Sequence, residues 1–509
     1  MSTSNNKRIA KNTLFLFLRM LVTVMVSLYT SRVVLDVLGV RDYGLYSVVG
    51  GVVLLFSFIS TTMASSTQRF LNFEKGRGDT NRVERLFGTS LFVHIVLGLC
   101  LFIIVESAGL WMLNKKLNID SERLTAANWI FHLSTISFVF TILNVPFRAA
   151  IIANEKMNVF ALINVVEVLL KLIIAISIPF FRGDKLIWYG VLVLLSTLIV
   201  NAMYSIYSKR KFLECKGKIC RDNEFLKSIF GFSSWTLLSG FSIVLRNQGL
   251  SILLNIFFGT TVNAAQGIAN QVNTVITGFA ANFTQAVNPQ IVKDYAAGRM
   301  KEMRNMVMFS SRVSFILIFL IAFPIFVEAD VILKIWLTTV PEYTVFFTRL
   351  VLAQALVESF ASVHSTAQGA TGKVKLYHFT LSLLGILNLP LSYFVLKAGA
   401  VPYSVLIISI IISGMISISR LIFLRKSIGL SLVKYFYDVV LRCLGIFLVS
   451  IPIPLLLKIR LNDSLLNTFL ISLLSALIIG VSSFWIGISS IERDRLTGSI
   501  KAKFKLNRF

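Results

Sequence analysis

Charged residues are scarce in this sequence. Only 15% of the 509 residues are charged, whereas 56% are hydrophobic. A soluble globular domain carries about 25% charged residues, so the composition excludes an ordinary water-soluble enzyme and favours a chain whose solvent is the bilayer. Cysteine is also rare, and two of the four cysteines, Cys215 and Cys220, have no histidine or further cysteine near them. We therefore predict reduced thiols and no metal site.

The alternating pattern of a membrane-barrel strand is missing as well. The apolar residues instead form continuous runs of about 20, which is the length that a helix needs to cross a bilayer. About fourteen such runs predict an all-α polytopic membrane protein. The first run, residues 14–34, is too long for a signal peptide and no small-residue cleavage site follows it. We expect it to be retained as a span.

The net charge of +26 follows the membrane topology. If both termini are cytoplasmic, the predicted cytoplasmic segments hold 34 of the 50 Lys and Arg residues and the outward segments hold 12. Cytoplasmic loops of membrane proteins are enriched in positive charge in this way. The basic balance therefore predicts orientation, with both termini inside, and gives no reason to expect nucleic-acid binding.

A basic stretch after the sixth run divides the chain into two groups of six spans. At an offset of 220 residues the two groups align several small and acidic residues: Gly39 with Gly259, Glu74 with Asp294, Gly78 with Gly298 and Ser90 with Ser310. An even number of spans between the copies makes the repeat parallel. The predicted domains are an N-terminal lobe (1–207), a basic cytoplasmic linker (208–231), a C-terminal lobe (232–426), spans 13 and 14 (437–490) and a basic cytoplasmic tail (491–509).

Four cationic side chains lie within or at the edges of apolar runs: Arg19, Lys171, Arg246 and Arg312. A charge at the bilayer centre costs about 2.5–3.5 kcal/mol on insertion scales, so such residues are candidates for function. Arg19 and Arg246 lie on the equivalent first helices of the two lobes, and a guanidinium matches phosphate oxygens. We predict both as substrate ligands, with snorkelling or helix pairing as the alternative.

Lys171 is a further candidate substrate ligand on span 5. It follows Glu167 by four residues, so the two side chains are expected on one helix face, where they could equally form an ion pair of their own. Arg32 and Arg148 lie near span ends and are predicted vestibule contacts, with snorkelling as the alternative.

Polar and acidic groups on later spans add to the predicted site. Gln266, Asn270 and Asn273 recur at helical spacing on span 8 and are expected either to contact substrate or to bond other helices. Glu358 on span 10 has no evident partner within one helical turn. Together with Glu167 it is a candidate for ion coupling, the alternative being a structural carboxylic acid.

Short motifs near the N-terminus carry a family resemblance. They are Lys11-Asn12-Thr13-Leu14, Leu28-Tyr29-Thr30-Ser31-Arg32, Leu38-Gly39-Val40-Arg41-Asp42-Tyr43-Gly44-Leu45-Tyr46 and Thr67-Gln68-Arg69-Phe70-Leu71, joined later by Asn288-Pro289-Gln290. With the six-plus-six-plus-two layout, the chain resembles the polysaccharide transporter family, the O-antigen or lipopolysaccharide flippases, of the multidrug/oligosaccharidyl-lipid/polysaccharide flippase superfamily.

The resemblance implies a multi-pass protein of the bacterial inner membrane that works by alternating access. Its implied substrate is a polyprenyl-pyrophosphate-linked oligosaccharide, an O-antigen or capsule or exopolysaccharide repeat unit, moved from the cytoplasmic to the outer leaflet. Spans 13 and 14 would offer a groove for the lipid tail or simply support the lobe. Membrane lipids and glycan-assembly enzymes are the implied partners, and no oligomer is implied.

Three other functions are open at this point. A cation-coupled drug antiporter would share the lobes but would need carboxylates in the lumen, whereas span 1 has Arg19 and no acid before Asp36. A lipid-II flippase would differ only in substrate. A membrane-embedded glycan polymerase or ligase would need an acid–base or metal-binding motif, and none is found. We expect no enzyme and no cofactor, with H⁺, Na⁺ or the membrane potential as the driving force.

Overall fold

The computed structural model describes residues 3–77, 79–154, 156–487 and 493. Every regular element within these ranges is a helix and none is a strand, which confirms the predicted all-α fold. The predicted basic tail lies outside the described residues except for Arg493, and so do the side chains of residues 3–21.

The helices follow one another along the chain with short connections. Those up to the middle of the chain are α1 (Thr3–Leu54), α2 (Ser57–Arg77), α3 (Thr80–Ile104), α4 (Leu110–Lys115), α5 (Leu124–Ala153), α6 (Met157–Ser177), α7 (Lys185–Lys211), α8 (Asn223–Phe258) and α9 (Thr260–Ala296). The remainder are α10 (Met300–Val327), α11 (Ala329–Trp336), α12 (Thr344–Ser359), α13 (His364–Ala370), α14 (Lys375–Lys397), α15 (Ser404–Ile428), α16 (Leu432–Tyr435), α17 (Arg442–Ser450), α18 (Pro452–Arg460) and α19 (Leu465–Ser482).

Twelve helical stretches in the described part of the chain are long and apolar enough to cross a membrane. The first two predicted spans are joined in α1, which bends at Gly39, and the second continues into α2. Helix α9, which carries the polar stripe of span 8, is not among the twelve. The chain is thus a multi-pass membrane protein, while a total of fourteen spans stays a prediction.

The chain packs as two compact units. Unit 1 holds the residues up to 268 together with 336–344 and 385–405, and unit 2 holds 269–335, 345–384 and the residues from 406 onward. The lobe boundaries predicted from the sequence divide the chain differently and stay predictions.

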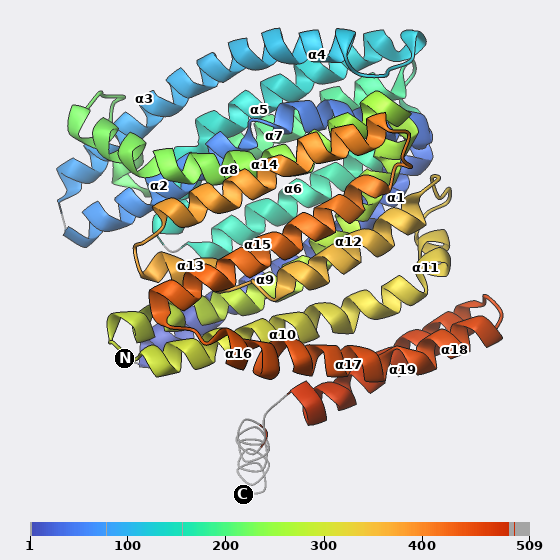
Figure 1. The fold of residues 1–509 in the computed structure, drawn as a ribbon. Coiled ribbons are helices and arrows are strands. Elements are labelled where there is room, and N and C mark those ends of the chain that lie inside the picture. Colours follow the sequence, from blue (N-terminus) through green and yellow to red (C-terminus); the bar gives the residue numbers. More distant parts are fainter. Residues whose placement is uncertain (1–2, 78, 155, 488–492, 494–509) are drawn as a thin grey trace, which may run out of the picture. The chain divides into compact units, whose positions relative to one another are not determined.

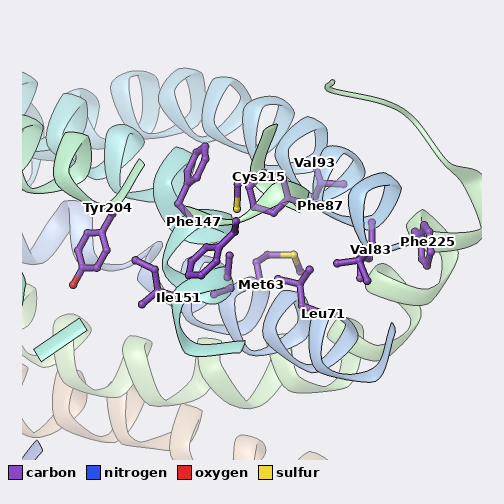
Figure 2. Close-up of a cluster of buried hydrophobic side chains, with 14 of the residues drawn as sticks. Met63, Leu71, Val83, Phe87, Val93, Phe147, Ile151, Tyr204, Cys215 and Phe225 are labelled. Atoms are coloured by element: carbon purple, nitrogen blue, oxygen red, sulfur yellow. The ribbon is translucent and has the colours of Figure 1, made fainter. Parts of the chain in front are cut away.

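Unit 1 is a helical bundle built around α5. This helix packs against α2, α3 and α7, while α1 lies along α6 (Figure 1). Figure 2 shows the apolar cluster at one end of the bundle, where Phe87 of α3, Phe147 of α5 and Met63 of α2 meet. Cys215, which follows α7, lies among these side chains and is 2% exposed.

Unit 2 attaches the last two membrane helices to α10. Phe315, Phe319 and Phe323 lie one turn apart on α10 and form an apolar cluster with residues of α17 and α19. At the end of α10, the buried carboxylate of Glu328 accepts hydrogen bonds from Lys458 Nζ of α18 and Thr468 Oγ1 of α19, both at 3.0 Å. Apolar packing and the hydrogen bonds to Glu328 therefore hold α17–α19 against α10.

Two pairs of equivalent positions have similar structures, which supports the predicted repeat. Gly39 and Gly259 both have φ of +78°, with ψ of 167° and −169°, so the same backbone bend follows the first predicted span of each half. Only glycine adopts this conformation without strain. The aligned acids Glu74 and Asp294 are each 3% exposed, and each pairs with an arginine shortly after it in the chain.

The stretch predicted as a basic linker is folded against unit 1. We call residues 212–222 the strap. Glu214 pairs with Lys75 of α2 at 2.5 Å and accepts a hydrogen bond from Asn154 at 2.9 Å, while the Cys220 thiol donates to the carbonyl of Arg85. Burial opposes ionisation of Glu214, but the bonds from Lys75 and Asn154 hold its pKa below the usual value.

The strap predicts unequal reactivity of its two cysteines. Burial raises the pKa of the Cys215 thiol to about 12, so almost no thiolate exists there at neutral pH. We expect maleimide to modify the half-buried Cys220 well before Cys215 in the native protein. Glu214→Gln removes the charge that holds Lys75 and should speed modification of Cys215 at least about tenfold, measured by peptide mass spectrometry; equal rates in both proteins would contradict this anchoring.

Candidate functional site

The Gly-x-x-Asp-Tyr-Gly element of residues 39–44 shapes one end of unit 1. After the bend at Gly39, Asp42 accepts two hydrogen bonds from Arg123, at 2.9 and 2.5 Å, and the same guanidinium bonds Asp184 at 2.6 Å. Asp184 also caps the start of α7 by accepting from the amide of Leu186. Burial opposes its ionisation, but Arg123 and the helix amides hold the pKa of Asp184 below the usual value.

Three of the predicted site residues meet inside unit 1. Lys171 Nζ donates to Glu167 Oε1 at 2.8 Å, which confirms that the two side chains share one face of α6. Glu167 also interacts electrostatically with Arg148, which reaches it from α5. The predicted private pair is therefore part of a three-charge group with two cations and one carboxylate.

Neutral polar side chains surround these charges. Arg148 donates to Asn201 Oδ1 of α7 at 3.2 Å and lies over the ring of Tyr204, 4.7 Å from its centroid. Asn164 of α6 donates to the Tyr204 hydroxyl at 3.1 Å. We call Arg148, Asn164, Glu167, Lys171, Asn201 and Tyr204 the unit-1 polar cluster. It extends about 10 Å along α6, from Asn164 to Lys171.

The unit-1 polar cluster has unused donors. Arg148 Nε and Asn201 Nδ2 are both buried, and neither donates a hydrogen bond within the described part of the chain. Buried donors without an acceptor are costly and call for a ligand or a water molecule. Two neighbouring donors beside a net positive charge suit an anionic group.

The sequence had no means of showing this cluster. Asn201 and Tyr204 are more than fifty residues from Arg148, and each alone is an ordinary polar residue of a span. Two aromatic side chains adjoin the cluster: Lys171 interacts electrostatically with Tyr46 of α1, and the ring of Tyr46 meets that of Tyr189 edge to face at 4.9 Å.

Glu358, the other predicted coupling residue, lies in unit 2. Its Oε1 accepts hydrogen bonds from Gln354 Nε2 at 3.0 Å and from Ser413 Oγ of α15 at 2.8 Å. The expectation that Glu358 lacks a partner within one turn was wrong, because Gln354 precedes it by four residues and donates to it. An amide is not an obvious partner for a carboxylate, so the sequence did not point to this bond. The half-buried Glu358 thus joins spans 10 and 12.

Span 10 is broken immediately after this carboxylate. Helix α12 ends at Ser359 and α13 begins at His364. The carbonyls of the intervening turn find partners on other helices: Tyr435 Oη donates to Phe360 O at 2.8 Å, and Arg420 donates to Ala361 O at 3.2 Å. A break inside a membrane is tolerated where such partners satisfy the freed backbone.

The remaining predicted cations are less defined. Arg246 is half-buried on α8 and Arg32 is half-buried on α1, before the bend. Arg19 lies on α1, but its side chain is outside the described residues. Their roles as substrate ligands stay predictions.

The predicted stripe on α9 is uneven in exposure. Gln266 is 4% exposed, Asn273 is half-buried and Asn270 is exposed. The side-chain oxygens of Gln266 and Asn273 are buried and accept no hydrogen bond within the described residues. The oxygens of Gln266 and Asn273 can therefore still accept hydrogen bonds from a polar ligand. Asn270 is exposed, so its amide is not buried without a partner.

An apolar pocket of about 180 Å³ lies in unit 2. Its walls come from α10, α12, α17 and α18, and include Phe319, Phe323, Leu356, Phe447 and Leu455. All of its lining side chains are hydrocarbon or aromatic, so it suits an apolar chain. Within the described residues, no group of three or more His, Cys, Asp or Glu side chains is placed to hold a metal.

Comparison with known proteins establishes the family. A family model described as "Polysaccharide biosynthesis protein" matches residues 9–294, more than half of the chain. The chain belongs to the polysaccharide biosynthesis protein family. The predicted resemblance is thereby confirmed, and the family's matched region includes the Gly39–Gly44 element, the strap and the unit-1 polar cluster.

A curated relative and two solved structures are similar to this chain. An uncharacterized membrane protein of Bacillus subtilis (strain 168), EpsK, is 20% identical over 62% of this chain, and the match spans 63% of that relative's length. The lipid II flippase MurJ, in an inward closed conformation, superposes with a TM-score of 0.66 at 15% identity over 93% of this chain and 98% of MurJ. An inward-facing MATE multidrug-resistance transporter superposes with a TM-score of 0.65 at 15% identity, over 81% of this chain and 98% of the transporter. The chain therefore has the MOP-superfamily fold.

Proposed function

We propose that this protein is a flippase that moves a polyprenyl-pyrophosphate-linked oligosaccharide, an O-antigen or capsule or exopolysaccharide repeat unit, from the cytoplasmic to the outer leaflet of the bacterial inner membrane by alternating access. Family membership supports a role in polysaccharide biosynthesis. The observation that best supports an anionic substrate is the unit-1 polar cluster, because it combines two cations, one carboxylate and two unused buried donors.

The division of work follows from chemistry. A pyrophosphate carries roughly two negative charges, and guanidinium and ammonium groups bind its oxygens by charge-assisted hydrogen bonds. Arg19, Arg246, Lys171 and Arg148 would share the head group in turn, and Arg32 would contact it at the vestibule. Gln266 and Asn273 would bond sugar hydroxyls. The apolar pocket of unit 2, walled partly by span 13, would hold a stretch of the polyprenyl tail.

The direct test is flipping in proteoliposomes. Wild type, Arg19→Ala, Arg246→Ala and Lys171→Ala would be given a defined glycan linked through either a pyrophosphate or a monophosphate. We expect each variant to flip the pyrophosphate-linked lipid at least about tenfold more slowly, since a charge-assisted hydrogen bond contributes about 1.5–3 kcal/mol. Lys115→Ala, an exposed cation at the far end of α4, is the matched control.

Failure of this test has distinct meanings. Unimpaired flipping by all three variants would remove the site assignment while leaving the transporter proposal. Absence of flipping by the wild type, together with drug efflux, would favour the cation-coupled antiporter. Faster flipping of lipid II than of other pyrophosphate-linked glycans would favour a lipid-II flippase, and a change in glycan length would indicate a polymerase or ligase.

The membrane potential is one proposed driving force. Moving two negative charges outward across a membrane whose inside is negative is favourable by about 4.6 kcal/mol per 100 mV. We therefore expect collapse of an imposed potential to slow flipping by at least about fivefold. An unchanged rate after valinomycin and potassium clamping would contradict voltage coupling.

A coupling ion is the alternative driving force. Glu358 is a half-buried carboxylate with two hydrogen-bond donors, and Glu167 is paired with Lys171. We propose Glu358 as the H⁺ or Na⁺ site, because Glu167 already has cationic partners. A pH or sodium dependence of flipping that disappears in Glu358→Gln would support this role.

A further inference from the structure

The strap separates its charges between two faces. Its acidic side chains face unit 1, with Glu214 paired with Lys75 and Asp222 lying 3.7 Å from Arg85. Its cationic side chains are exposed, namely Lys216, Lys218 and Arg221. Three further exposed cations precede it directly at the end of α7: Lys209, Arg210 and Lys211. The ion pairs thus hold the strap in place, and the charged side chains left exposed on it are basic.

The strap lies at the level where an apolar run begins. Gly88 of α3 packs so closely on it that an added Cβ would overlap the carbonyl oxygen of Lys218 and lie 3.0 Å from Cys220 Sγ. Gly88 belongs to the candidate membrane span Thr80–Lys115 and lies about 12 Å along α3 from its start at Thr80. The cations next to this contact therefore lie beside the first turns of a candidate membrane-spanning helix.

Exposed apolar side chains are interspersed with these cations. Leu213 is 69% exposed and Ile219 is 55% exposed, although the neighbouring Cys215 is fully covered. Segments that lie at a bilayer interface have this composition, because the apolar groups enter the acyl boundary and the cations meet phosphates.

We propose that the outer face of the strap is a docking surface for anionic phospholipid headgroups of the leaflet on its side of the membrane. Lys216, Lys218 and Arg221 bind the phosphates, and Ile219 and Leu213 rest at the acyl boundary. The inference does not rest on the proposed substrate or transport direction. It adds a lipid-binding role to charges that otherwise only orient the helices.

Lipid-specific quenching tests the proposal on the full chain in nanodiscs. A bimane probe is attached at Ile219→Cys after Cys100→Ser and Cys220→Ser remove the accessible thiols. Spin-labelled phosphatidylglycerol and phosphatidylcholine are then compared as quenchers. We expect half-maximal quenching at a mole fraction at least about fivefold lower for phosphatidylglycerol. The difference should vanish in molar salt, where the Debye length is about 3 Å.

Matched variants assign the effect to the strap. Lys216→Gln/Lys218→Gln/Arg221→Gln should abolish the preference. The control Lys115→Gln/Arg182→Gln/Lys185→Gln removes the same amount of charge at the end of α4 and near the start of α7, whereas the strap follows the other end of α7. This control should keep the preference for phosphatidylglycerol. Resistance of Cys215 to maleimide in a parallel sample shows that the strap is still folded. Equal quenching by both lipids in the wild type, or a preference retained by the strap variant, would overturn the proposal.

Discussion

Gly44→Ala is expected to prevent the protein from accumulating in a folded form. A Cβ at this position would overlap the carbonyl oxygen of Thr260 and lie 2.8 Å from its carbonyl carbon and 3.2 Å from the amide nitrogen of Ala264. These are backbone atoms of the first turns of α9, so no side chain can swing aside. Overpacking usually costs about 1–3 kcal/mol, and contact with rigid backbone puts this substitution at or above the upper end.

Gly50→Ala is the matched control on the same helix. Nothing lies within 4 Å of a Cβ built there, and alanine favours a helix over glycine by about 1 kcal/mol. Its melting temperature should therefore equal or exceed that of the wild type, while Gly44→Ala should lose most of its monodisperse peak in detergent size-exclusion chromatography. Equal melting temperatures for the two variants would show that α1 and α9 are not packed as described.

The second large effect concerns Lys171. Lys171→Gln leaves Glu167 without its 2.8 Å partner and removes one cation from the unit-1 polar cluster. Losing one member of a fully buried pair costs about 3–5 kcal/mol, but Lys171 is 44% exposed, so we expect about 1–2 kcal/mol in stability. We expect flipping of a pyrophosphate-linked lipid to fall at least tenfold, because a charge-assisted bond to the head group is lost.

The double variant Glu167→Gln/Lys171→Gln separates structure from binding. It removes both charges of the 2.8 Å pair, so only the electrostatic interaction of Glu167 with Arg148 is lost, and thermal stability should exceed that of Lys171→Gln and approach that of the wild type. If Lys171 binds the head group, flipping stays low despite the recovered stability. Recovery of flipping together with stability would show that Lys171 only balances the charge of Glu167. The variants are compared at equal reconstitution, which is checked by the protein-to-lipid ratio.

Much of the fold could be predicted because the bilayer imposes simple rules on sequence. Runs of about 20 apolar residues specify spanning helices, and the described structure has a helix at every predicted run. The alignment of Gly39 with Gly259 corresponds to one shared backbone conformation that restricts the residue type, while the repeat itself stays a prediction. The spacing of Glu167 and Lys171 likewise fixed a shared helix face.

What the sequence could not show depends on partners far along the chain. The break in span 10 is stabilised by Tyr435 and Arg420, which lie on other helices, so the local sequence of α12 and α13 gives no warning. Arg148 joins Glu167 only because α5, α6 and α7 pack together. The packing of the strap could not be predicted either, because its acidic anchors, Glu214 and Asp222, are outnumbered by cations in the local sequence.

Unit 1 also sets an order for biosynthesis. It includes residues 385–405, and Gly249 of α8 packs on Leu389 of α14 so tightly that a Cβ would lie 2.7 Å from the leucine methyl groups. Roughly 140 residues separate the two, and a ribosome adding about 5–20 residues per second needs about 7–30 seconds to make them. During that interval α8 lies in the membrane without its final neighbour, so the surface around Gly249 is covered only after residues 385–405 have been made.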